Sequence, residues 1–150
     1  MSIIYLDTSA LLKLYVQEAH SAETLALIQG AAGVGTSVLT YTETAAALAR
    51  AVRMELLSDD AARAAWRQFQ ADWPGYTRLK LSTALVERAA ALAWDFGLRG
   101  YDATHLASAL LWQEALGEPV NLAAFDRALW NAARQAGLPV WPPAASDRPA

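Results

Sequence analysis

Short apolar segments alternate along this chain with longer stretches in which apolar residues recur every three or four positions. The short segments predict five strands, at residues 3–6, 33–38, 76–81, 120–123 and 138–141. The longer stretches predict helices over 8–16, 21–29, 40–54, 58–72, 82–97, 102–115 and 126–137, separated mainly by Gly and Pro positions.

No pair of strands is joined by a hairpin turn; helices separate most of them. This alternation predicts an α/β fold with three layers, in which helices cover both faces of a short-stranded, mainly parallel sheet. We find no repeat and no linker, so residues 1–141 are expected to form one domain. The Pro-rich segment 142–150 is expected to be a disordered tail.

Composition narrows the functional classes. Of 150 residues, 55% are hydrophobic, yet no apolar run approaches the roughly 20 residues that span a bilayer. The N-terminal apolar run is too short for a signal peptide, so a cytoplasmic location without membrane contact is expected. The absence of cysteine excludes thiolate chemistry and zinc–thiolate sites. A net charge of −3 argues against a generic nucleic-acid binder, but not against a nuclease that uses a metal ion.

Three aspartates stand near predicted helix starts: Asp7, Asp102 and Asp126. Each, taken singly, is explained by helix capping. However, Asp7 and Asp126 also follow apolar strand-like runs, and the carboxyl ends of parallel strands share one edge of the sheet. Acids gathered there could not all stay ionised and unpaired, which favours a bound divalent cation.

Glu43 is the acid that capping does not explain, because it lies inside a predicted helix. Its neighbours one turn away are Leu39, Thr40, Ala46 and Ala47, so the usual ion pair on a helix surface is missing. We expect this side chain to be partly buried and therefore to need a partner.

Four motifs in sequence order resemble those of PIN-domain proteins, and in particular the VapC-type toxins of toxin–antitoxin pairs. They are LDTSA at 6–10, TE at 42–43, YDATHLA at 101–107 and FDRAL at 125–129. The resemblance covers residues 3–141. One motif alone is weak, but four in this order are fairly specific.

The resemblance implies a PIN-like fold and a metal-dependent ribonuclease whose acids at Asp7, Glu43, Asp102 and Asp126 bind Mg²⁺ or Mn²⁺. It also implies RNA as substrate, a cognate antitoxin as partner and a homodimer. Thr8 or Ser9 matches a hydroxyl position that supports the site. The family usually has Thr two residues before its last aspartate, and here Ala124 stands there, which puts hydroxyl support near Asp126 in doubt.

A carboxylate set suits Mg²⁺, which prefers hard oxygen ligands. We expect Asp7 and Asp102 to be direct ligands, and Glu43 and Asp126 to bind through water or to complete a second site. His105 is expected to support the site rather than bind the ion. Candidate phosphate contacts are Lys13, Arg50, Arg99 and Arg127, although any one of them, taken singly, is better explained as an ordinary surface charge.

Two other functions compete with the nuclease. The chain could be a non-catalytic PIN-like interaction module, for which Ala124 is the only hint. It could also be a phospho-acceptor domain, but the first strand is followed by a single acid rather than a pair, and Ser9 replaces the second acid of an Asp-x-Asp motif.

Overall fold

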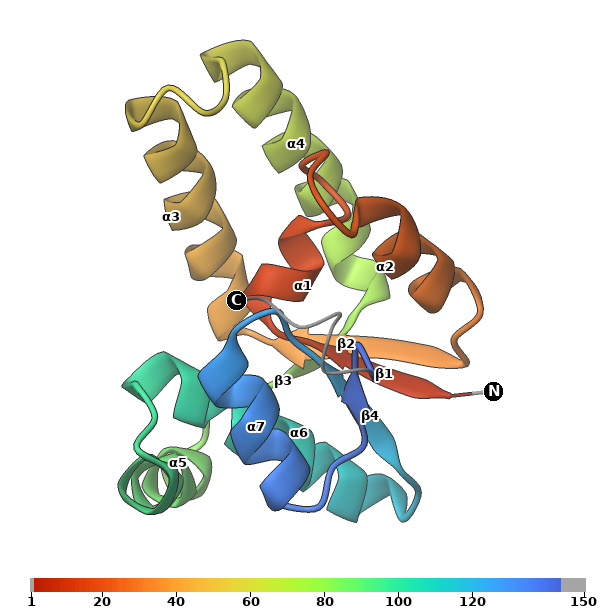
Figure 1. Cartoon of the computed structure of the whole chain (residues 1–150), viewed down its shortest axis with the longest axis vertical. Helices are drawn as coiled ribbons and strands as arrows, with labels where there is room; N and C mark the ends of the chain where they lie inside the picture. The colour runs from red at the N-terminus through yellow and green to blue at the C-terminus, as the bar shows by residue number, and fades with distance from the viewer. Residues whose placement is uncertain (1, 144–150) are drawn as a thin grey trace.

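The computed structural model describes residues 2–143, and Figure 1 shows a central sheet with helices on both sides. All five strands are parallel, in the order β3-β2-β1-β4-β5. Their bounds are β1 (Ile3–Leu6), β2 (Gly33–Ser37), β3 (Thr77–Leu79), β4 (Val120–Ala123) and β5 (Val140–Trp141). The predicted three-layer α/β fold is confirmed.

The helices divide between the two faces of the sheet (Figure 1). Helices α1, α2 and α4 lie on one side and α5, α6 and α7 on the other, while α3 and α4 project together as an arm. Their bounds are α1 (Thr8–Leu12), α2 (Ser21–Gln29), α3 (Leu39–Arg53), α4 (Asp59–Asp72), α5 (Thr83–Phe96), α6 (Gly100–Leu116) and α7 (Arg127–Gln135), with a short 3₁₀ turn η1 (Trp73–Gly75).

Strand β1 lies at the centre and is buried on both faces, as its continuous apolar sequence requires. Tyr5 belongs to the core under α5, α6 and α7, while Ile4 and Leu6 belong to the core under α1 and α4. Side chains alternate between the two faces of a strand, so β1 contributes to the hydrophobic core on each side of the sheet.

One glycine is required for packing between β2 and α6. A Cβ atom on Gly35 would lie 2.7 Å from the Trp112 ring and 2.9 Å from the carbonyl oxygen of Thr77. Both distances are too short for real contacts. The backbone of β2 therefore lies directly against the indole ring, which is almost fully buried.

Some boundaries differ from those expected. Helix α1 ends at Leu12 instead of residue 16, because the amides of residues 13–15 bond to carbonyls three positions back and tighten the chain into turns. Helix α6 begins at Gly100, so Asp102 lies inside its first turn and caps nothing; Arg99 holds the N-cap position. The capping explanation of Asp102 is therefore wrong.

The strand order reverses direction at β1, between β2 and β4, and open parallel sheets place ligands at the carboxyl edge of such a point. Asp7 follows β1 there, and Asp126 follows β4. Within residues 2–143, no helix has the length and hydropathy needed to cross a membrane. The predicted domain boundary at 141 stays a prediction, and residues 144–150 of the expected tail lie outside the described part of the chain.

Candidate active site

Asp7 is held firmly at the end of β1. Its Oδ1 accepts hydrogen bonds from the Ala10 amide at 2.8 Å and from the Ser9 hydroxyl at 2.7 Å. The first bond makes Asp7 the N-cap of α1, so capping and site-building coincide in one side chain. The Ser9 hydroxyl oxygen also accepts a hydrogen bond from the Phe125 amide at 3.0 Å, which ties this loop to the end of β4.

Glu43 reaches the same place from α3. Its Oε1 accepts hydrogen bonds from the Thr8 hydroxyl at 2.6 Å and lies 2.7 Å from Nε2 of His105 on α6. The other ring nitrogen of His105, Nδ1, lies 2.7 Å from the hydroxyl of Tyr5 in β1. A chain of hydrogen bonds thus joins β1, α6 and α3, and the expectation that Glu43 is partly buried with a partner is confirmed.

The remaining two acids share one cation. Arg99 donates from Nε to Oδ2 of Asp102 at 3.0 Å and from a terminal nitrogen to Oδ2 of Asp126 at 2.9 Å. Asp102 is almost fully buried, and Asp126 also accepts from the Leu129 amide at 2.9 Å as the N-cap of α7. Arg99 therefore bridges the first turn of α6 and the start of α7.

Electrostatic interactions link Asp7 with Asp102 and Asp102 with Asp126, while Glu43 is connected to them through His105. Burial raises the pKa of Asp7 to about 6; His105 and the Ser9 hydroxyl act against this rise and Asp102 adds to it. Burial and then Asp126 raise the pKa of Asp102, opposed by Arg99. Burial also acts to raise the pKa of Glu43, but hydrogen bonds from His105 and Thr8 outweigh it and leave that pKa lowered.

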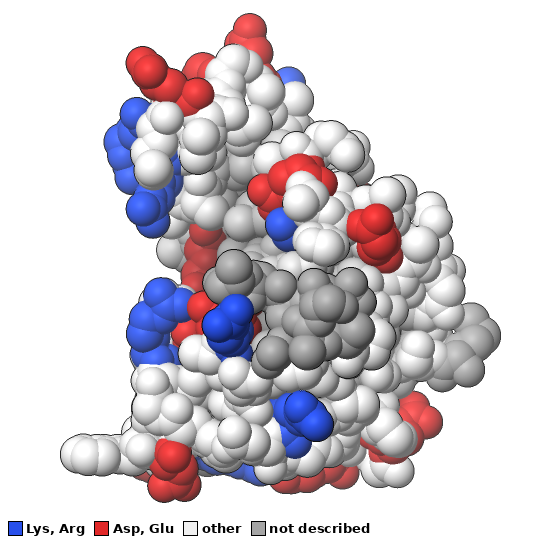
Figure 2. All heavy atoms as spheres, viewed as in Figure 1, with Lys and Arg blue, Asp and Glu red and all other residues white. Residues whose placement is uncertain are grey.

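Figure 2 shows acidic side chains inside a recess between the α3–α4 arm and the part built from α5 to α7, with basic side chains on both sides. A hollow of about 670 Å³ opens on one side of this recess. Thr8 and Glu43 line one part of it, and Arg50, Arg53 and Tyr101 line others.

The donor atoms suit a hard divalent cation. They are carboxylate oxygens. Burial, and to a lesser degree neighbouring acids, raises the pKa of Asp7 and of Asp102, and a bound dication would offset this cost of holding the ionised carboxylates. Within residues 2–143, however, no three His, Asp or Glu side chains have the spacing of a preformed metal site. In this state Arg99 pairs with two of the acids and His105 with a third. The residues fit the ion by type, and binding requires these contacts to rearrange.

The sequence left open whether Thr8 or Ser9 supports the site, and in the structure the Thr8 hydroxyl contacts Glu43 and the Ser9 hydroxyl contacts Asp7. The metal-binding roles of the four acids stay predictions. His105 contacts Glu43, consistent with its expected supporting place. Ala124 is buried and carries no hydroxyl, yet Asp126 is held by Arg99 and the Leu129 amide. The bridging position of Arg99 was missed; its only sequence signal is the three-residue spacing to Asp102.

Comparison with known proteins identifies the family of this chain. The sequence matches the PIN domain family over residues 4–135. It is 37% identical over 143 residues to two Mycobacterium tuberculosis proteins, Ribonuclease VapC45 and Ribonuclease VapC49, covering 95% of this chain and 96% of each relative.

Solved structures share the fold at low sequence identity. A toxin–antitoxin complex from Klebsiella pneumoniae superposes with a TM-score of 0.63 at 20% identity, covering 95% of this chain and 98% of that one. FitAcB from Neisseria gonorrhoeae gives 0.63 at 16% identity, covering 94% and 98%. The match over residues 4–135 and the 37% identity to relatives of equal length show that this chain belongs to the PIN domain family.

Proposed function

We propose that this protein is a metal-dependent endoribonuclease, the toxin of a type II toxin–antitoxin pair, which hydrolyses RNA phosphodiester bonds at a carboxylate-bound Mg²⁺ or Mn²⁺ site. The observation that carries the proposal is the convergence of Asp7, Glu43, Asp102 and Asp126 from four distant segments at the carboxyl edge of the sheet. The equal-length relatives named as VapC ribonucleases support the same reaction.

Each acid has a distinct part in this mechanism. Asp7 and Asp102, the most buried, would hold the ion directly, and Asp126 would complete the set once its contact with Arg99 is released. When bound, Mg²⁺ supplies positive charge to the phosphoryl oxygens and lowers the pKa of water.

Glu43 is suited to orient the attacking water. Its lowered pKa keeps it ionised at neutral pH. Thr8 and His105 both contact Oε1, and Oε2 has no hydrogen bond to the rest of residues 2–143. That oxygen can accept a hydrogen bond from water, while the Tyr5–His105 contact keeps the carboxylate in place.

The test is cleavage of a labelled single-stranded RNA by purified protein. Wild type should cleave with Mg²⁺ and lose activity in EDTA. Asp7→Asn and Asp102→Asn should not cleave, whereas Asp95→Asn, an exposed control on α5, should match wild type. Folded wild-type protein that cleaves no RNA, or equal activity in Asp7→Asn, would overturn the proposal; the first result would favour the non-catalytic interaction module.

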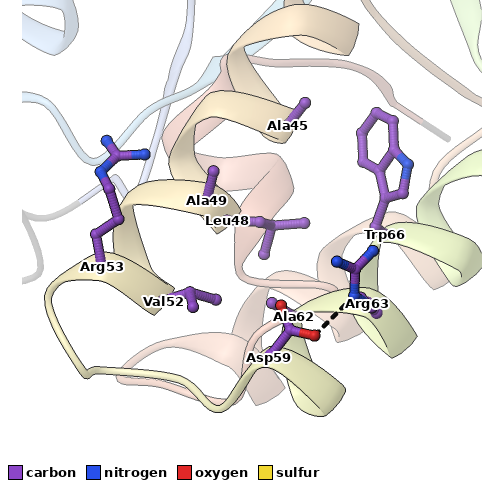
Figure 3. Close-up of a pocket in the computed structure, with 9 residues that line it drawn as sticks. All are labelled: Ala45, Leu48, Ala49, Val52, Arg53, Asp59, Ala62, Arg63 and Trp66. Atoms are coloured by element: carbon purple, nitrogen blue, oxygen red, sulfur yellow. Dashed lines mark hydrogen bonds and ion pairs between the residues drawn. The ribbon is translucent and has the colours of Figure 1, made fainter.

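An antitoxin is the expected protein partner, and the α3–α4 arm offers an apolar groove for it (Figure 3). In Figure 3, Leu48 of α3 points toward the side of Trp66 of α4, and Val52 points toward Ala62. Leu48 is buried, while Trp66 and Val52 are partly exposed. An amphipathic segment seated there would cover these side chains.

The groove connects the partner site to the acids. Arg53 lines both this groove and the hollow that reaches Glu43. A bound segment could therefore continue toward the acids and place a basic side chain beside them. Val52→Glu, at a partly exposed position of this groove, should weaken the complex with the cognate antitoxin without reducing RNA cleavage; undiminished binding would exclude this groove. A homodimer and a cytoplasmic location also stay predictions, to be tested by light scattering and cell fractionation.

A further inference from the structure

The hollow beside Glu43 combines three features that suit a single strand of RNA. Small side chains of α3 line part of it: Ala46, Ala47 and Ala51. Arg50 and Arg53 line it, and so does Tyr101, which is 42% exposed. We propose that this hollow binds the RNA backbone through Arg50 and Arg53 and stacks one base on Tyr101; this rests on the proposed ribonuclease function.

The two arginines are available for phosphate. Both are exposed, and neither forms an ion pair with an acid in residues 2–143. The only hydrogen bond of the Arg50 guanidinium within that range goes to the sulfur of Met54 at 3.3 Å. By contrast, Arg63 on α4 is paired with Asp59 at 2.7 Å. Two cations without carboxylate partners in one hollow fit the charge of a nucleic-acid backbone.

The two arginines lie along α3 at increasing distance from Glu43. Arg50 lies seven residues after Glu43, almost two full turns of α3, so both share one face of the helix at a separation of roughly 10 Å along its axis. Arg53 lies three residues further, roughly 5 Å along the axis. A strand that contacts both arginines therefore runs along α3 toward Glu43.

Tyr101 supplies an aromatic surface next to the acids. It is adjacent to Asp102 at the start of α6, and the Arg99 guanidinium lies 4.6 Å from its ring centroid. Bases stack on exposed aromatic rings without regard to sequence, and a neighbouring cation adds to the attraction. The arginines would thus give affinity, and Tyr101 would hold a nucleotide close to the reacting phosphate.

The test measures RNA binding in an Asp7→Asn background, so that cleavage does not interfere. Fluorescence anisotropy of a labelled 12-nucleotide single-stranded RNA is recorded across a salt series with Mg²⁺. Each of Arg50→Gln and Arg53→Gln should reduce the slope of log affinity against log salt by about 0.7, and the double variant by about 1.4. Arg67→Gln is the charge-matched control, an exposed arginine on α4 outside this hollow.

Tyr101 has its own controls. Tyr101→Ala should weaken binding about fivefold or more at every salt concentration with the slope unchanged, and Tyr101→Phe should restore it. The double variant Arg50→Lys, Arg53→Lys should keep most of the slope, which would exclude misfolding as the cause of the loss in the double Gln variant. Equal slopes in the Asp7→Asn parent, its Arg67→Gln variant and its double Gln variant would overturn the proposal even if wild type cleaves RNA. If the slopes change as expected but the wild-type protein cleaves no RNA, the proposed binding site is kept and the proposed ribonuclease function is rejected.

A second inference comes from the ion-pair geometry at the other end of the site. We infer that Arg99 is an internal counter-cation that the divalent ion must displace from Asp102 and Asp126. The guanidinium contacts one oxygen of each carboxylate, at 3.0 Å and 2.9 Å, and its side chain is 60% exposed. It can therefore leave toward solvent without opening the core, and it offsets acid–acid repulsion while the metal is absent.

Manganese binding measured by calorimetry tests this inference without relying on activity. Arg99→Gln should bind Mn²⁺ about three- to tenfold more tightly than wild type. Arg127→Gln removes the same charge next to Asp126, at an exposed residue without an acidic partner in residues 2–143, and should change affinity much less. Arg99→Lys should bind Mn²⁺ with an affinity between those of wild type and Arg99→Gln, because the ammonium keeps the charge but lacks the planar fork and the reach with which the guanidinium bridges the two carboxylates.

Each remaining outcome counts against the counter-cation. Affinity that is equal in wild type and Arg99→Gln, or that rises equally in Arg127→Gln, would overturn it while leaving the metal site intact. Wild-type affinity in Arg99→Lys would show that charge alone acts and that bridging is irrelevant. No Mn²⁺ binding by wild type or Arg99→Gln would remove both the counter-cation and the proposed metal site.

Discussion

Replacing Asp7 with Asn should stabilise the metal-free protein, although Asp7 sits at the centre of the proposed site. Burial raises the pKa of this carboxyl from 3.8 to about 6, so at neutral pH the fold holds an ionised group at a cost. The difference corresponds to about 3 kcal/mol at pH 7, since one pKa unit is worth about 1.4 kcal/mol. The Asn amide removes the charge, and its oxygen can still accept the hydrogen bond from the Ala10 amide.

The sign of the pH dependence follows from the raised pKa. The folded protein holds the Asp7 proton more tightly than the unfolded chain, so this contribution to stability is complete below about pH 4 and is lost as pH rises through 6. The advantage of Asp7→Asn should therefore be up to about 3 kcal/mol at pH 7 and about half of that at pH 5.

The assay is urea unfolding in EDTA at both pH values, with exposed Asp95→Asn as control. Repeating it with Mg²⁺ should reverse the order, because only wild type would gain stability from binding the ion. A metal-free Asp7→Asn protein that is less stable than wild type at pH 7, or an advantage that does not change between pH 7 and 5, would refute the reasoning.

Three further predictions follow from the packing and hydrogen bonds. Asp102→Asn should abolish Mg²⁺-dependent RNA cleavage while leaving the circular dichroism spectrum unchanged; residual activity near the wild-type level would contradict the ligand assignment. His105→Ala should lower the free energy of unfolding by about 2–4 kcal/mol, because it leaves a cavity and removes the buried partner of Tyr5; a loss below 1 kcal/mol in urea unfolding would count against this. Gly35→Ala should cost about 1–3 kcal/mol, because its methyl group would meet the Trp112 ring; an unchanged melting temperature would show that the ring can move away freely.

Most of the fold could be predicted from the sequence, because the strands are short, buried and separated by helices. β1 is apolar throughout and β4 is apolar except for Asn121; both were located to the residue, as was α2. Segment 76–81 was assigned as a longer strand than β3, since alternation at an edge strand does not show where pairing stops. The early end of α1 depends on tight turns that periodicity does not encode.

Site residues could be predicted where neighbouring positions in the sequence set them apart. Contacts between side chains from distant segments could not be predicted. Asp7 and Glu43 stood out because one ends a buried strand and the other lacks an ion pair on its own helix. The hydrogen bond between His105 and Tyr5 joins residues 100 positions apart, and no pattern in either segment predicts it. The hollow beside Arg50 is likewise a product of tertiary packing, although this residue was named as a phosphate candidate.

The most direct test of the central claim is a crystal structure with Mn²⁺, examined for anomalous scattering. The account predicts a peak at the carboxyl edge of the sheet, about 2.0–2.2 Å from oxygens of Asp7 and Asp102, with the Arg99 guanidinium moved away from Asp126. No peak at these carboxylates in crystals soaked with saturating Mn²⁺, or a peak only elsewhere, would contradict it.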